Sequence, residues 1–302
     1  MLRALDLFGA EWRKLWGNRR VSGCALVVWP VMALGASLGL LLLNVLEARL
    51  RTVQLLSWTD VALGVWDVQS NLIGRVAVLA VAATLFAGEY QWRTWKNIVP
   101  RRPRVQLMAA KFAVLGFAIL LTFIVMSVVM TVGFGVVNLV VGAPYGPEPT
   151  LNVIGDFLTR YSIRAGLSFV DTLLIGAVVA LLAMRARSVL AGAFFGLVVL
   201  LIDEALILIL GTLSLLFNNE SWLELLRLRF TYNLANLSAI LQGGGPLAPV
   251  PFPITMNASG TGFVPPSVEA NSLALSALIV TVWFVGLVGL ALVSFQRQDI
   301  LD

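Results

Sequence analysis

The sequence predicts an all-α integral membrane protein with six transmembrane helices, and both its hydropathy pattern and its composition support this fold class. Six apolar runs are each long enough to cross a bilayer, because a hydrocarbon core of about 30 Å needs about 20 helical residues. Hydrophobic residues make up 59% of the 302 residues and charged residues only 12%, which is too apolar for a soluble domain. We expect one transmembrane domain over residues 1–302, with spans near 21–46, 68–88, 112–141, 165–184, 188–217 and 270–296.

The distribution of basic residues predicts the orientation of these spans. Fourteen of the 21 lysines and arginines fall on the side of the N-terminus, which places both termini in the cytoplasm by the positive-inside rule. The net charge of +5 and the pI of about 9.9 therefore reflect topology better than nucleic-acid binding. The run at 21–46 is longer than a signal-peptide core, so we expect it to be retained as a span.

Residues 1–20 predict an amphipathic helix that lies in the membrane interface ahead of the first span. This helix is either a simple anchor or a mechanical element. Pro30 lies about nine residues into the first span, where a proline can kink a helix. The apolar residues at helical spacing are Leu2, Leu5, Phe8, Trp12, Leu15 and Trp16.

The chain lacks the residues that several kinds of catalysis require. It has no histidine, and Cys24 is its single cysteine, which excludes the usual zinc sites, serine-type triads and internal disulfides. A phosphate-binding loop needs a lysine directly after a glycine, whereas Lys14, Lys96 and Lys111 each follow another residue. We therefore predict a transport subunit rather than an enzyme, and any ATP-driven activity requires a partner chain.

The loop between the second and third spans predicts a short cytoplasmic helix. Trp92, Trp95 and Val99 can share one helical face, and Pro100 ends the helix before a basic return segment. The alternative is an ordinary positive-inside loop with interfacial aromatic residues.

Taken together, these features resemble the membrane permeases of type-2 ABC exporters, over nearly the whole chain. The similarity lies in the E-Y-x-x-x-T-like stretch from Glu89 to Thr94, the R-P-like pair at 102–103 and the F-x-R-x-D-I tail at 295–300. The resemblance implies that the helix after Glu89 is a coupling helix that docks in a groove of a separate ATPase, with a second, smaller contact at 185–187. The implied coupling residues are Glu89, Trp92, Arg93, Thr94, Trp95, Lys96, Arg185 and Arg187.

The same resemblance implies how the protein assembles. Two copies of an ABC ATPase subunit would bind ATP and Mg²⁺, and this permease chain would pair with a second one, either identical or different. The chain itself would hold no cofactor and would bind lipid but no nucleic acid. Its implied location is the cytoplasmic membrane of a prokaryote, as a multi-pass protein.

Ionisable residues also fall within the predicted spans, where charges usually face a bundle interior or an aqueous cavity. Arg75, Asp171 and Asp203 share a depth of about 21–24 Å from the cytoplasmic boundary, at about 1.5 Å per residue. We hypothesise an outer polar layer in which Arg75 pairs with Asp203 or Glu204, with Asp171 nearby. The layer either belongs to a transport pathway or only fixes helix packing through ion pairs.

The third run is longer than a perpendicular span requires. It stays uncharged from Phe112 to Pro147. We therefore expect it to tilt, to protrude, or to break near Gly133 and Gly135.

Residues 218–269 predict an extracytoplasmic amphipathic helix followed by a Gly/Pro-rich loop. The helix of about 20 residues begins at a capping box at Ser221 and ends at Gly243. It covers the outer end of the bundle, or it forms a substrate lid or a re-entrant element.

Three classes of function compete for this chain. An ABC export permease explains the interfacial helix, the coupling-type loop and the missing nucleotide site together, and is the function we predict. The alternative is a secondary transporter that uses the charges of Arg75, Asp171, Asp203 and Glu204, but paired discontinuous helices of the inverted-repeat type are not evident. A membrane enzyme is the weakest choice, since histidine and clustered acidic motifs are missing.

Overall fold

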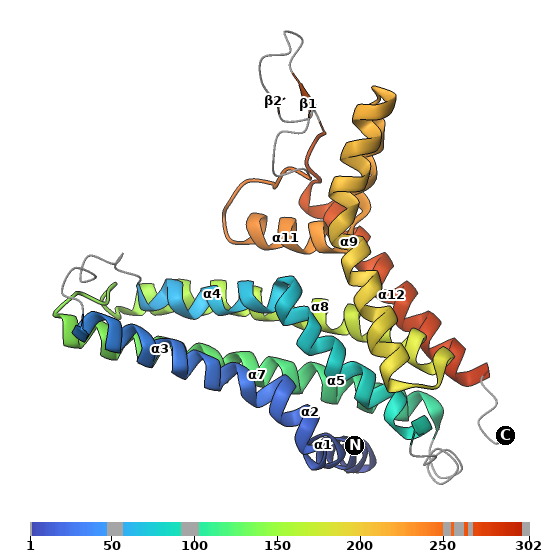
Figure 1. Cartoon of the computed structure of the whole chain (residues 1–302), viewed down its shortest axis with the longest axis horizontal. Helices are drawn as coiled ribbons and strands as arrows, with labels where there is room; N and C mark the ends of the chain where they lie inside the picture. The colour runs from blue at the N-terminus through green and yellow to red at the C-terminus, as the bar shows by residue number, and fades with distance from the viewer. Residues whose placement is uncertain are drawn as a thin grey trace. The chain divides into compact units, whose positions relative to one another are not determined.

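The computed structural model describes residues 2–46, 57–91, 103–249, 255–256, 263–264 and 268–297. Within these ranges the chain is helical apart from connecting turns and two short strands, β1 (Thr255–Met256) and β2 (Phe263–Val264), which pair antiparallel (Figure 1). The predicted all-α fold class is therefore confirmed.

Five helices in the described part of the chain are long and apolar enough to cross a membrane. They correspond in order to the predicted second to sixth spans. They are α5 (Leu72–Gln91), α7 (Arg104–Val141), α8 (Leu151–Ala186), α9 (Val189–Phe217) and α12 (Leu273–Arg297). The first predicted span contributes a shorter apolar helix, α3 (Val28–Leu46).

The chain forms two compact units, residues 1–193 with 291–302 and residues 194–290. In the first unit α3 lies beside α7, α5 lies beside α8, and α4 (Trp58–Ser70) contacts both α7 and α8 (Figure 1). Trp66, Phe86 and Phe123 are each at most 2% exposed, so they form part of the core of this unit. The predicted single transmembrane domain stays a prediction.

The predicted N-terminal helix is present, and the first predicted span consists of three helical segments. α1 (Leu2–Gly17) is the predicted amphipathic helix. After it come α2 (Arg19–Ser22) and a π-helix (Gly23–Val27), which leads into α3 without a gap. Pro30 lacks the N–H that would bond to the carbonyl of Leu26, and the wider π turn lies at this point of the helix. The distortion expected at Pro30 is therefore a local change of helical pitch.

The predicted second span, 68–88, is wrong at its start. α4 ends at Ser70, Asn71 adopts an extended conformation with a ψ of 169°, and α5 begins at Leu72. Hydropathy joins the end of α4 to α5 because both are apolar, whereas the backbone separates them.

The third and fourth spans are long, uninterrupted helices. α7 is a single helix of 38 residues, so the predicted run does not break at Gly133 or Gly135, and its tilt or protrusion stays a prediction. A Cβ at Gly133 would lie 2.3 Å from the Ser37 hydroxyl oxygen, so glycine allows α3 to approach α7 closely. α7 ends at Val141, and Gly142 caps it with a left-handed φ of 73°. α8 starts earlier than predicted, because the Thr150 side chain caps it.

In the second unit, the predicted continuous helix from Ser221 to Gly243 is wrong. The segment consists of α10 (Ser221–Glu224), the 3₁₀-helix η4 (Leu225–Leu228) and α11 (Phe230–Leu241). The backbone is extended at Arg229, with a ψ of 133°, which separates η4 from α11. The Ser221 hydroxyl does not serve as the predicted cap, because Glu220 occupies the N-cap position of α10 and Ser221 is its first helical residue. The end near Gly243 is as predicted, with a φ of 82°.

Buried asparagines connect this segment to the start of α12. The Asn271 side chain accepts a hydrogen bond of 2.7 Å from Arg227 Nε and donates one of 2.9 Å to Asn233 Oδ1. The Asn236 amide donates to the Asn271 carbonyl at 2.8 Å and to Ser276 Oγ at 2.9 Å. All three asparagines are fully buried, so their bonds hold η4, α11 and α12 together. The role of this segment as a cover or lid stays a prediction.

Candidate functional site

The amphipathic helix α1 docks on the bundle through aromatic side chains. The rings of Phe8 and Trp12 lie 5.7 and 5.4 Å from the ring of Phe117 on α7, in edge-to-face arrangements. Leu15 is 2% exposed, whereas Leu5 and Trp16 remain exposed at 59% and 41%. This packing turns the side of α1 that carries Glu11 toward α5 and α7.

Four charged side chains from three helices meet at this docking site. Lys14 Nζ lies 2.6 Å from Glu11 Oε1 and 2.8 Å from Glu89 Oε1. Lys111 Nζ lies 2.9 Å from Glu11 Oε2 and 2.7 Å from Glu89 Oε2, the latter as an ion pair without hydrogen-bond alignment. The charges therefore alternate around a ring, with each lysine between two carboxylates. We call Glu11, Lys14, Glu89 and Lys111 the four-charge cluster.

Burial makes this cluster strongly interdependent. The side chains of Glu11, Glu89 and Lys111 are 4%, 4% and 2% exposed, and only that of Lys14 reaches solvent, at 42%. Lys111 Nζ also donates a hydrogen bond of 2.6 Å to the Leu85 carbonyl of α5. Since a buried charge is tolerated only when it is paired and hydrogen-bonded, each member fixes the position of its neighbours.

The two members on α1 have pKa values that reflect this pairing. Burial alone would raise the pKa of Glu11, but the nearby ammonium groups of Lys111 and Lys14 outweigh it and lower the pKa. Burial would lower the pKa of Lys14, but the carboxylates of Glu89 and Glu11 outweigh it and raise the pKa. Both groups are therefore charged over the whole neutral range.

The structure places the predicted coupling residues in three different situations. Glu89 is only 3% exposed and belongs to the four-charge cluster, and its coupling role stays a prediction. Arg185 and Arg187 are exposed around the turn between α8 and α9, where Arg187 has a left-handed φ of 51°. The others lie outside the described residues, and their coupling role stays a prediction. These are Trp92, Arg93, Thr94, Trp95 and Lys96.

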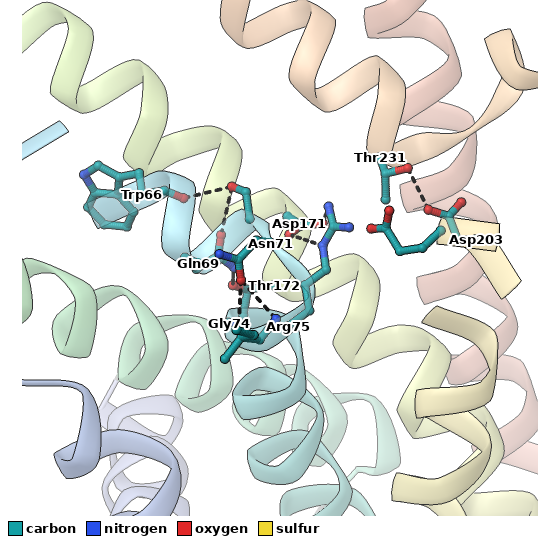
Figure 2. A network of polar contacts seen from close by, with 12 residues as sticks. Trp66, Gln69, Asn71, Gly74, Arg75, Asp171, Thr172, Asp203 and Thr231 are labelled. Carbon is teal, nitrogen blue, oxygen red and sulfur yellow. Dashed lines mark hydrogen bonds and ion pairs between the residues drawn. The ribbon is translucent and has the colours of Figure 1, made fainter. Parts of the chain in front are cut away.

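The polar layer predicted within the spans has a defined part in the first unit. Arg75 Nε and Nη2 of α5 lie 3.2 and 3.4 Å from the two carboxylate oxygens of Asp171 on α8. One residue further along α8, Thr172 Oγ1 accepts a hydrogen bond of 3.2 Å from Gln69 Nε2 of α4 (Figure 2). All four residues are at most 5% exposed. We call Gln69, Arg75, Asp171 and Thr172 the helix-break clamp.

The second unit has its own buried ion pair. Arg229 donates from Nη2 and Nε to the two oxygens of Asp203, at 2.9 and 3.3 Å. The Thr231 hydroxyl donates to Asp203 Oδ2 at 2.7 Å (Figure 2). Glu204 Oε2 lies 3.9 Å from Arg229 Nη2. Each predicted aspartate thus has an arginine partner within its own unit. The pairing of Arg75 with Asp203 or Glu204 stays a prediction.

Sequence reasoning missed Glu11, Lys111 and Arg229 as interacting residues. Glu11 falls on the helical face of Phe8, Trp12 and Leu15, so an acidic residue on the apolar face of α1 was the available signal. Lys111 directly precedes a long apolar run and was counted only as a loop charge. Arg229 had no signal, because its backbone turn is not encoded by glycine or proline.

These observations first define the class of protein. Several membrane-length apolar helices, an amphipathic N-terminal helix and ion pairs enclosed between helices are typical of a multi-pass membrane protein. In the described part of the chain, no group of three histidine, cysteine or acidic residues could hold a metal ion.

Comparison with known proteins then gives the family. Residues 7–203 match the model of the ABC-2 family transporter proteins, which is more than half of the 302 residues. The chain therefore belongs to the ABC-2 transporter family and is a permease component of an ABC transporter, a class that in general works with an ABC ATPase and as a dimer. Comparisons with curated proteins and with solved structures gave no match.

Proposed function

We propose that this chain is the permease subunit of an ABC exporter, and that its four-charge cluster carries ATP-driven motion from a separate ATPase into the membrane helices. In this proposal both termini and the loop at 92–102 face the cytoplasm of a prokaryotic cell. Two ATPase subunits bind ATP and Mg²⁺, and two permease chains form the transmembrane pathway.

The observation that carries the proposal is the position of Glu89. This residue lies near the end of α5, directly before the loop that resembles a coupling helix, and it is ion-paired with Lys14 of α1 and Lys111 of α7. A displacement of that loop would therefore pull on the interfacial helix and on α7 through buried charges, and not on α5 alone. Alternating attraction in a low-dielectric site resists separation of these helices.

In this proposal Glu89 acts in coupling although its side chain is buried. Glu89 does not need to touch the ATPase, because the residues that follow it make that contact in the proposal. Its role is to position α5 against α1. Trp95 and Lys96 are the candidates for the contact itself, with Arg185 and Arg187 at the smaller second contact.

The test is reconstitution with the ABC ATPase encoded beside the permease. We expect the ATPase to copurify with the permease in detergent and its hydrolysis rate to rise when the permease is present. Trp95→Ala should weaken copurification. Lys14→Gln should preserve copurification but reduce the stimulation by roughly tenfold, equivalent to about 1.4 kcal/mol.

Arg13→Gln is the matched control, since Arg13 is the neighbouring cation on α1, is exposed, and among the described residues donates within its own helix to the Gly9 carbonyl. It should leave copurification and stimulation unchanged. Equal loss in both variants would refute a specific role for the cluster. Transport by vesicles that contain only the permease and an ion gradient would instead support the secondary-transporter alternative.

A further inference from the structure

The predicted second span, 68–88, contains an interruption of the helix at Asn71. In a continuous helix the amides of Ile73 and Gly74 would donate to carbonyls four residues earlier, in α4. Both donate instead to the side-chain oxygen of Asn71, at 3.0 and 3.1 Å. Asn71 N donates back to the Asp67 carbonyl, so this residue ends α4 and caps α5 at once. The two helices are therefore separate rods.

The junction is also closely packed. A Cβ placed on Gly74 would lie 2.2 Å from the Val68 carbonyl oxygen and 2.6 Å from the Gln69 Cα. Only glycine lets the first turn of α5 approach the last turn of α4 this closely. The close approach therefore depends on Gly74 and limits the angle that α4 and α5 can form.

One turn of α8 bonds to both rods. Asp171 forms an ion pair with the guanidinium of Arg75 on α5, and the adjacent Thr172 accepts a hydrogen bond from Gln69 of α4 (Figure 2). Neighbouring residues of a single helix thus hold the two sides of the break. All four side chains are buried, so solvent does not compete for their bonds.

We propose that α4 and α5 are two helices joined at Asn71, and that Asp171 and Thr172 are positioning residues that set the angle between them. At the joint, side-chain hydrogen bonds replace the main-chain hydrogen bonds of a continuous helix. The angle between α4 and α5 therefore depends on the clamp. One consequence rests on the proposed function: when ATP hydrolysis moves α5, which carries Glu89, the joint lets α5 move while α4 stays in place.

The test measures the joint in the permease alone, in lipid nanodiscs. Spin labels are attached at Asp60→Cys and Val76→Cys, two exposed positions on α4 and α5, in a Cys24→Ser background. A matched pair at Val105→Cys and Val128→Cys, which are 44% and 58% exposed, reports on the single helix α7. Pulsed electron paramagnetic resonance then gives the distance distribution of each label pair. It is measured with and without the combined Asp171→Asn and Thr172→Val changes.

We expect the combined variant to broaden or shift the α4–α5 distribution while the α7 distribution stays unchanged. An α4–α5 distribution identical to that of the native clamp would overturn the proposal. If the α7 distance also changed, the bundle would have been disturbed, and Thr172→Val alone then decides, since it removes one hydrogen bond and leaves the ion pair in place. An unchanged distribution in that variant would again overturn the proposal.

A second arm separates this inference from the proposed function. In the ATPase complex, ATP should shift the α4–α5 distance and leave the α7 distance unchanged. If ATPase binding and stimulation occur without that shift, the moving joint is refuted and the proposed function stands. If the ATPase does not bind, the proposed function fails, while the clamp result in the permease alone still holds.

Discussion

The four-charge cluster and the helix-break clamp lie in the same unit and use ion pairs in different ways. In the cluster each lysine lies between two carboxylates, at 2.6 to 2.9 Å, and the four side chains together join three helices. In the clamp the forked guanidinium of Arg75 meets one carboxylate, at 3.2 and 3.4 Å. An ammonium group has donors in three directions and suits bridging, whereas a guanidinium suits a paired, directional contact.

This difference has a mechanical consequence. The cluster shares every charge between two neighbours, so it holds α1, α5 and α7 as one body. The clamp assigns separate side chains of α8 to separate rods, so one contact can loosen while the other persists. Substitutions should therefore affect the cluster as a whole and the clamp in parts.

The largest effect is expected for Lys111→Met. The change leaves Glu11 and Glu89 buried beside a single, half-exposed lysine, and removing one partner of a buried ion pair typically costs about 3–5 kcal/mol. Thermal unfolding in detergent should show a large fall in Tm. Combining the change with Glu89→Gln should restore part of the loss, and a Tm equal to that of the native chain in Lys111→Met would contradict the shared-charge interpretation.

A smaller loss is expected for Arg75→Lys. Lysine keeps the charge but cannot reproduce the two parallel bonds to Asp171, so we expect a cost of about 1–3 kcal/mol. The comparison with Lys111→Arg sharpens the argument, because that change keeps the charge but loses the bridging geometry. Denaturant or thermal unfolding of both variants is the measurement, and full stability of Arg75→Lys would show that charge alone is enough at this site.

The cluster also predicts a defined dependence on pH. The pKa of Glu11 is lowered from 4.5, so its contribution is complete above pH 4.5 and is lost as the pH falls through its lowered pKa. The pKa of Lys14 is raised from 10.5, so its contribution is complete below pH 10.5 and is lost as the pH rises through its raised pKa. The difference in Tm between the native chain and Glu11→Gln should therefore be constant near neutrality and shrink in acid. A difference that persists unchanged at pH 3 would contradict this assignment.

The comparison also shows what the sequence could predict. Apolar periodicity gave the amphipathic helix and the order of the long helices, because those patterns depend on burial alone. Asp171 and Arg75 were found as charges in apolar runs, since such charges are costly and need partners. The partner of Asp203 was missed because Arg229 is brought in by a backbone turn, which depends on tertiary contacts and not on local propensity. The break at Asn71 was missed because both sides of it are apolar.

The smallest effect is expected at the joint itself. Asn71→Ala removes the cap on the amides of Ile73 and Gly74, which typically costs about 0.5–2 kcal/mol, whereas Asn71→Asp keeps an acceptor at the same place. Thermal unfolding should therefore rank the two variants with the alanine below the aspartate. If the joint is held by its cap, Asn71→Ala should also broaden the α4–α5 distance and Asn71→Asp should not. Equal stability of both variants would mean that the clamp on α8, and not the cap, maintains the break between the two rods.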